Sequence, residues 1–201
     1  MIFHKENKIC FSLVPRTGST SLRHLLLKLK MRQVFMKDPF SMAHGKYKDA
    51  VKDYPSLSQY TIYGVFRNPA QRLVSTLNLN PPSGINLPNQ AKQVVISKPV
   101  KDQSVLVDEI RSGLLNNPEN ILFQPQYRWF EGISNPKVID FDHLQAGLDA
   151  ALAGLEGDKT IPHLHQSKVK HVHLTPELEA FAREYYAADY QFAKDVLGKE
   201  Y

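Results

Sequence analysis

The stretch VPRTGSTSLRHLL, from Val14 to Leu26, decides the fold class. It continues the apolar run KICFSLV, which predicts a buried strand over Lys8–Val14. Leucines at helical spacing then predict a helix over Ser19–Lys30. A turn between a strand and a helix presents free backbone N–H groups at the helix N-terminus, where the helix dipole also favours negative charge. The stretch therefore predicts an anion-binding loop.

Six consecutive residues of this loop are candidate anion ligands: Arg16, Thr17, Gly18, Ser19, Thr20 and Ser21. Gly18 allows close approach of the backbone, the hydroxyl groups are donors, and Arg16 has two parallel N–H groups to offer an oxyanion. The alternative is a plain strand-to-helix turn capped by serine or threonine. The Gly-x4-Gly-Lys-Ser/Thr pattern of nucleoside-triphosphate loops is absent, which weakens a kinase or ATPase interpretation.

Strands and helices alternate along the rest of the chain. YTIYGVF, Tyr60 to Phe66, is rich in β-branched and aromatic residues and predicts a strand. NPAQRLVSTL predicts a helix with Asn68 as its N-cap. Shorter strands are expected at RQVFM and PKVIDF, and helices at GKYKDAVKDY, SVLVDEIRSGLLNN, DHLQAGLDAALAGL with Asp142 as its cap, and 175–198. This alternation predicts an α/β fold, a three-layer sandwich with a central parallel sheet.

Composition predicts one globular domain over residues 1–201, of which 42% are hydrophobic. Residues 78–103 are punctuated by Pro, Gly and Asn, which is typical of a long loop or flap. The net charge of +5 fits an anionic ligand, but the basic residues are too scattered to favour nucleic acid. A single cysteine, Cys10, and the lack of a long apolar run lead us to expect a cytoplasmic protein with no membrane partner.

A second stretch, GVFRNPAQRLVSTL, repeats the arrangement of the first. Arg67 directly follows a predicted strand, and Ser75 lies about two turns along the next helix. Open α/β sheets bind ligands where parallel strands give way to helices, so Arg67 and Ser75 are candidates to bind one phosphate together. The alternative is a surface arginine beside a helix cap. Two separate anion sites suit a nucleotide that carries charge at two places.

These two stretches together resemble the sulfotransferases that use 3′-phosphoadenosine 5′-phosphosulfate (PAPS), in particular the carbohydrate sulfotransferase-like branch, sulfotransferase family 2. The similarity extends to AHGKYKDAVKDY, VIDFDHL, IPHLHQSK and YYAADYQFAKDVLG, and covers most of the chain outside 78–103. It implies the P-loop nucleoside-triphosphatase-like sulfotransferase fold. It also implies transfer of a sulfuryl group from PAPS to an acceptor hydroxyl, with 3′-phosphoadenosine 5′-phosphate (PAP) as product and a carbohydrate as the expected acceptor.

The resemblance also implies roles for individual residues. Residues 16–21 would hold the 5′-phosphosulfate, while Arg67 and Ser75 would hold the 3′-phosphate. Ser167 and Lys168 would lie near the 3′-phosphate. His163 would face the acceptor; the alternative is a histidine that simply packs. The chain departs from the family at Arg16, where lysine is usual, and arginine is a poor proton donor because its pKa exceeds about 12. Two alternatives therefore stay open: a catalytically inactive PAPS- or PAP-binding protein, and a nucleoside-triphosphate-dependent phosphotransferase.

Three further candidates concern the acceptor and a metal. His44, between the two motifs, is the candidate catalytic base, since histidine takes up a proton near neutral pH; the alternative is a loop histidine without a role. Trp129, the only tryptophan, is a candidate to stack on a sugar ring; the alternative is a core position. The pairs His163/His165 and His171/His173 have zinc-ligand spacing for a strand, but no carboxylate pattern completes a site, and we expect no metal.

Overall fold

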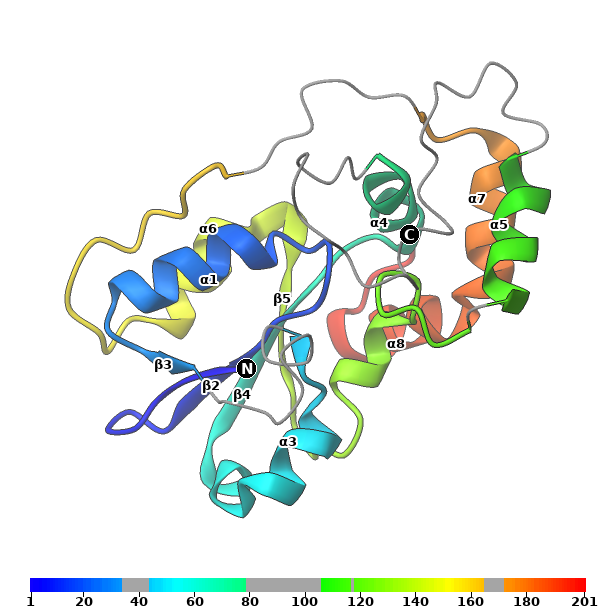
Figure 1. Cartoon of the computed structure of the whole chain (residues 1–201). Helices are drawn as coiled ribbons and strands as arrows, with labels where there is room; N and C mark the ends of the chain where they lie inside the picture. The colour runs from blue at the N-terminus through cyan, green and yellow to red at the C-terminus, as the bar shows by residue number, and fades with distance from the viewer. Residues whose placement is uncertain (34–43, 79–105, 117, 165–171) are drawn as a thin grey trace, which may run out of the picture.

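The computed structural model describes residues 1–33, 44–78, 106–116, 118–164 and 172–201. Its centre is a five-stranded sheet with the order β3-β1-β2-β4-β5 (Figure 1). The strands are β1 (Ile2–His4), β2 (Ile9–Ser12), β3 (Arg32–Gln33), β4 (Thr61–Phe66) and β5 (Lys137–Asp140). Residues 79–103 of the predicted loop lie outside the described residues.

The sheet is mixed, which corrects the expectation of a parallel sheet. β2 pairs with β4 and β4 with β5 in parallel, whereas β1 is antiparallel to both β2 and β3. Residues 5–8 form a tight turn between β1 and β2, and Lys8 in this turn has a φ of 51°. So short a connection reverses the chain, whereas parallel neighbours need a long crossover. The parallel part, β2-β4-β5, carries both arginine motifs.

Helices cover both faces of the sheet. The helices are α1 (Ser19–Lys28), α3 (Tyr47–Asp53), α4 (Pro69–Leu77), α5 (Leu106–Asn116), α6 (Leu144–Ala151), α7 (Pro176–Tyr185) and α8 (Ala187–Leu197). The described residues also form the 3₁₀ turns η1 (Pro55–Gln59) before β4, η2 (Gln126–Trp129) before β5, and η3 (Phe141–His143) between β5 and α6. None of the described helices is long and apolar enough to cross a bilayer.

Successive side chains along β2 and the two residues after it point to opposite faces of the sheet, and each face is covered by helices. Phe11 and Leu13 pack into the apolar cluster of α1 and α6, while Cys10 and Val14 face the opposite clusters, which include residues of α3 and α8. A separate apolar cluster joins α4, α5 and α7, and α5 and α7 lie side by side at the right of Figure 1. This arrangement holds α4 next to the sheet with its first turn at the end of β4.

Two predicted helix boundaries are wrong. The helix expected over 175–198 is two helices, α7 and α8, which meet at Tyr186. The break allows the buried carboxylate of Asp189 to accept hydrogen bonds from two backbone N–H groups of η2. Asp142 does not cap the helix after β5, because Asp140 accepts the Asp142 N–H at 3.1 Å in η3, and α6 begins at Leu144. Asn68 caps α4 as predicted, and Thr175 caps α7.

Candidate functional site

The two arginine motifs meet at the ends of neighbouring parallel strands. Arg16 follows β2 and Arg67 follows β4, and these strands run side by side in the same direction. Arg16 Nη2 donates to the carbonyl oxygen of Ser75 at 2.9 Å and to its Oγ at 3.0 Å. Arg67 Nη1 donates to the carbonyl oxygen of Arg16 at 3.3 Å. The structure thus joins the loop after β2 and the first turns of α4 into one site.

A third arginine, Arg72 on α4, lies behind this pair and was not among the predicted ligands. Its side chain is fully buried. Nε donates to the carbonyl oxygen of Pro15 at 3.0 Å, and Nη2 donates to that of Leu122 at 3.1 Å. Arg72 therefore fixes the backbone directly before Arg16. The sequence signal for it is weak: an arginine one turn after the Asn-Pro start of a helix is ordinarily a surface residue.

Carboxylates compensate the three guanidinium groups only at longer range: the charge of Asp142 acts on Arg67, and Asp189 and Arg72 act on each other. Among the described residues, none of the three guanidinium groups forms an ion pair with a carboxylate. Each has a buried N–H without a hydrogen-bond partner in the part of the chain that the structure describes: Nε of Arg16, Nε of Arg67 and Nη1 of Arg72. Removing a charge from water costs several kcal/mol, on the order of the desolvation penalty of one ion, unless a partner compensates it. A bound anion would supply both a close negative charge and the missing acceptors.

Burial and repulsion by neighbouring positive charges both lower the pKa values of Arg16 and Arg67. Burial lowers the pKa of Arg16, and the positive charges of Arg67 and Arg72 lower it further. Burial also lowers the pKa of Arg67, although Asp142 acts in the opposite direction. The Arg67 guanidinium lies 4.4 Å from the centre of the Phe141 ring. Arginine stays protonated despite such shifts, so the site is a cluster of positive charge in a partly desolvated setting.

The loop backbone is shaped for close approach of a ligand. Arg16 and Gly18 both have left-handed φ values, 65° and 76°. A Cβ at Gly18 would lie 3.3 Å from Phe141 Cε2, so glycine suits both the space and the angle. Arg16 pays a strain of roughly 1–2 kcal/mol in the same region of φ. α1 begins at Ser19 without a side-chain cap, which leaves the N–H groups of its first turn for a ligand.

The loop hydroxyls have different surroundings. Thr17 is buried, and its hydroxyl donates to the carbonyl oxygen of Val14 at 2.9 Å, so it shapes the loop. Ser21 Oγ accepts the backbone N–H of Leu164 at 3.1 Å. Ser19 is buried, and Thr20 is exposed. The sequence offered four hydroxyl donors, and the structure shows that two of these hydroxyl groups bond to the protein's own backbone.

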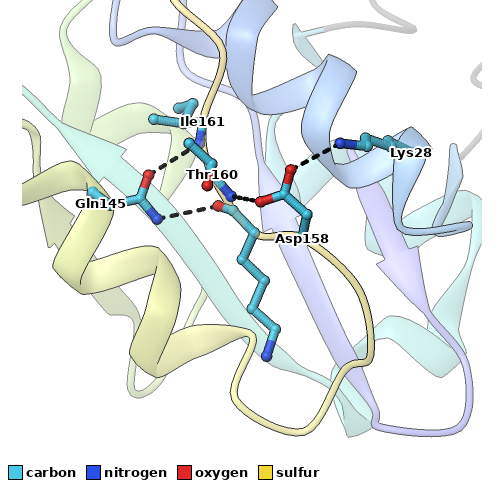
Figure 2. Close-up of polar contacts among 6 residues, drawn as sticks. Lys28, Gln145, Asp158, Thr160 and Ile161 are labelled. Atoms are coloured by element: carbon cyan, nitrogen blue, oxygen red, sulfur yellow. Dashed lines mark hydrogen bonds and ion pairs between the residues drawn. The ribbon is translucent and has the colours of Figure 1, made fainter.

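Residues 158–164 run from one end of α1 to the other, and Figure 2 shows how the start of this segment is fixed. Asp158 accepts from Lys28 Nζ at 3.1 Å and from the backbone N–H of Thr160 at 3.0 Å. These contacts lower the pKa of Asp158 to about 2. The Gln145 amide donates to the carbonyl oxygen of Lys159 and accepts from the N–H of Ile161.

Residues 158–164 also contain His163, which the sequence predicted to face the acceptor. The backbone N–H of Leu164 donates to Ser21 Oγ, so the end of this segment lies at the first turn of α1. His163 precedes that contact and is exposed. Ser167 and Lys168 follow the segment and lie outside the described residues. Residues 158–164 thus lead the chain to the loop that follows β2.

His44, the candidate base, is held at the end of β2. Its Nδ1 lies 2.7 Å from the carbonyl oxygen of Leu13. Since a carbonyl oxygen only accepts, Nδ1 carries the proton in the neutral ring and the lone pair remains on Nε2. Burial lowers the pKa of His44, although the bond to Leu13 acts in the opposite direction. His44 therefore keeps a proton-accepting Nε2 below the pH at which an exposed histidine is half protonated.

Trp129 occupies a core position, which was the alternative to its predicted role of stacking on a sugar ring. Its side chain is fully buried and packs with Val14, Phe66 and Phe130. Nε1 donates to the backbone carbonyl oxygen of His44 at 2.9 Å. No face of the ring is open to a sugar, so Trp129 supports His44 and does not stack on an acceptor.

Comparisons of the chain with protein-family models, with curated proteins and with solved structures found no match. Within the described ranges, no group of three or more His, Cys, Asp and Glu residues is arranged to hold a metal ion. A groove of about 760 Å³ follows β5 between α6 and α8, and none of the three arginines lines it. The most distinctive chemical feature of the described residues is the group of three arginines with unpaired N–H donors.

Proposed function

We propose that the chain is a PAPS-dependent sulfotransferase that transfers the sulfuryl group to an acceptor hydroxyl, with a carbohydrate as the acceptor. One observation carries the proposal: three partly or fully buried guanidinium groups with unpaired N–H donors gather where β2 and β4 end. Clustered positive charge with unpaired N–H donors is a property of sites for multiply charged anions. PAPS carries negative charge at both its 3′ and 5′ positions, and the site is built from two arginine motifs.

In the proposed reaction, the acceptor oxygen attacks sulfur in line with the bond to the 5′-phosphate. A new S–O bond forms, the bond between sulfur and the bridging oxygen breaks, and PAP departs with the electron pair. The acceptor proton goes to Nε2 of His44. Arg16 and the N–H groups at the start of α1 stabilise the charge that develops on the transferring group and on PAP. Arg67 and Ser75 hold the 3′-phosphate.

A second candidate function is a PAP-binding protein without turnover, and one contact favours it. Arg16 Nη2 is bonded twice to Ser75, so this side chain reaches towards α4 and the 3′-phosphate residues. An arginine used there contributes to binding, but it does not protonate a leaving oxygen, because its pKa is too high. Binding of PAP is common to both candidates, and turnover separates them.

The first experiment is calorimetric titration of PAP into the wild type, with ATP as the competing ligand class. We expect PAP to bind and ATP to bind at least tenfold more weakly, which is a difference in binding free energy on the order of 1.4 kcal/mol. Arg67→Ala should abolish PAP binding, whereas Arg183→Ala, an exposed arginine paired with Glu179, should not. Equal binding of PAP and ATP would instead support the phosphotransferase alternative.

Turnover is then measured as release of PAP from PAPS in the presence of carbohydrate acceptors. Acceptor-dependent release supports the sulfotransferase. PAP binding without release for any acceptor supports the binding protein.

A further inference from the structure

The 3₁₀ turn η2 holds the backbone of Arg67 through one side chain. Gln126, the first residue of η2, is fully buried. Its Oε1 accepts the backbone N–H of Arg67 at 3.1 Å, and its Nε2 donates to the carbonyl oxygen of Arg67 at 2.8 Å. The amide thus pairs with both polar groups of a single residue, as a neighbouring strand would. This pairing fixes the direction in which the Arg67 side chain leaves the end of β4.

The last residue of the same turn holds His44. Trp129 Nε1 donates to the carbonyl oxygen of His44 at 2.9 Å, while the His44 ring is bonded to Leu13 at the end of β2. One four-residue turn therefore contacts the backbone of an anion-binding arginine and of the candidate base. Their separation depends on the conformation of this turn.

The turn itself is fixed from α8. The Asp189 carboxylate accepts the backbone N–H of Gln126 and that of Tyr127, each at 2.8 Å. Asp189 is fully buried, and the charge of Arg72 acts on it. A buried carboxylate that accepts two N–H groups at the start of a turn is a strong constraint on that turn. A chain of contacts therefore runs from Asp189 on α8 through Gln126 to Arg67.

We propose that η2 is a positioning element of the anion site, in which Gln126 positions Arg67, Trp129 positions His44, and Asp189 fixes the turn. Gln126 and Trp129 act through the backbones of Arg67 and His44, so all three residues are positioning residues. The inference rests on the proposed function for the identity of the ligand. Precise placement matters because a displacement of about 1 Å can cost on the order of a hundredfold in rate.

Gln126→Leu tests the proposal, because leucine fills similar space but cannot pair with the Arg67 backbone. The matched control is Gln124→Leu. Gln124 is also buried, and its amide binds the carbonyl and carboxylate oxygens of Glu119, away from Arg67. The readout is the ratio of affinities for PAP and adenosine 5′-phosphate, which differ by the 3′-phosphate alone. A purely structural role lowers the melting temperature of both variants and leaves the ratio unchanged.

We expect Gln126→Leu to reduce the PAP preference about tenfold or more, and Gln124→Leu to keep it. A preserved preference in Gln126→Leu overturns the inference while leaving the proposed function intact. A wild type without PAP preference overturns the proposed function instead. In that case the Arg67 Nε–H resonance in ¹⁵N-labelled protein decides the inference, since it needs no nucleotide: a shift in Gln126→Leu but not in Gln124→Leu supports positioning, and no shift overturns it.

Discussion

Arg16 Nη2 donates to both the carbonyl oxygen and the hydroxyl of Ser75, at 2.9 and 3.0 Å. This contact joins the loop after β2 to α4, although 59 positions separate the two residues. The family resemblance pairs Ser75 with Arg67, whereas the structure pairs its side chain with Arg16. Because Ser75 Oγ accepts from Arg16, its own hydroxyl proton remains available to a phosphate oxygen.

Ser75→Ala is therefore expected to weaken PAP binding about three- to tenfold, equal to roughly one hydrogen bond. The bond from Arg16 to the carbonyl oxygen of residue 75 survives the change, so the free energy of unfolding should fall by less than about 1 kcal/mol. Calorimetry and denaturant unfolding measure the two effects. Ser58→Ala, which removes a hydroxyl bonded to Pro55 in η1, is the control. Unchanged PAP affinity in Ser75→Ala would exclude this serine from the site.

Anions should stabilise the protein through Arg67. At a concentration 100 times its dissociation constant, PAP is expected to add about 2.7 kcal/mol to the free energy of unfolding of the wild type. In Arg67→Gln this gain should vanish, while the ligand-free stability changes little, because the change also removes a charge that repels Arg16. Thermal unfolding with and without PAP measures both. The idea fails if PAP stabilises Arg67→Gln as much as Arg183→Gln.

Arg16→Lys restores the residue that is usual in the resembling family. Lysine cannot donate two directed bonds as a guanidinium does, so PAP affinity should fall by about tenfold. Turnover should rise relative to the wild type, since an ammonium group can protonate the bridging oxygen. Single-turnover release of PAP from bound PAPS measures the step apart from binding. A fall in both affinity and turnover would mean that Arg16 already performs the catalytic role.

His44→Gln should lower turnover by about 10²–10⁴-fold and leave PAP affinity unchanged. Burial lowers the pKa of His44, so the acid limb of the pH–rate profile should lie below the ordinary value of 6.5. The same shift gives a stability contribution that is present above pH 6.5 and is lost as the pH falls through the lower native pKa. His173→Gln, at an exposed histidine, serves as control. A profile whose acid limb persists in His44→Gln would assign the base to another group.

Local signals in the sequence predicted much of this fold. The strand, turn and helix around Val14–Leu26 and the capped start of α4 follow from residue periodicity and capping residues, which act over a few positions. The mixed sheet was missed because β1 has only three residues, too few for a period to be visible. Gln126 was missed as well, since a buried amide that pairs with a backbone 59 positions away leaves no local pattern. The break between α7 and α8 likewise reflects tertiary contacts of Asp189.

Asp189 is expected to make stability depend on pH between about 4 and 6. Burial raises its pKa to about 6 from an ordinary 3.8, against the opposing effects of Arg72 and of the two N–H groups of η2. A native pKa above the unfolded one means that the native state binds more protons in this window. The contribution of Asp189 to the free energy of unfolding should therefore be highest below pH 4, fall as the pH rises through 6, and then level off, a change of up to about 3 kcal/mol.

Asp189→Asn removes the titrating group, so its stability should lack this fall with pH. An asparagine presents only one acceptor oxygen, so the variant should leave one of the two N–H groups of η2 that the ionised carboxylate accepts without this partner. Urea unfolding at several pH values between 4 and 8 measures the difference, with Asp195→Asn on the same helix as the control. Parallel curves for the wild type and Asp189→Asn would show that Asp189 is ionised throughout this range. The carboxylate would then be a fixed charge that holds η2 at every pH at which the site binds its anion.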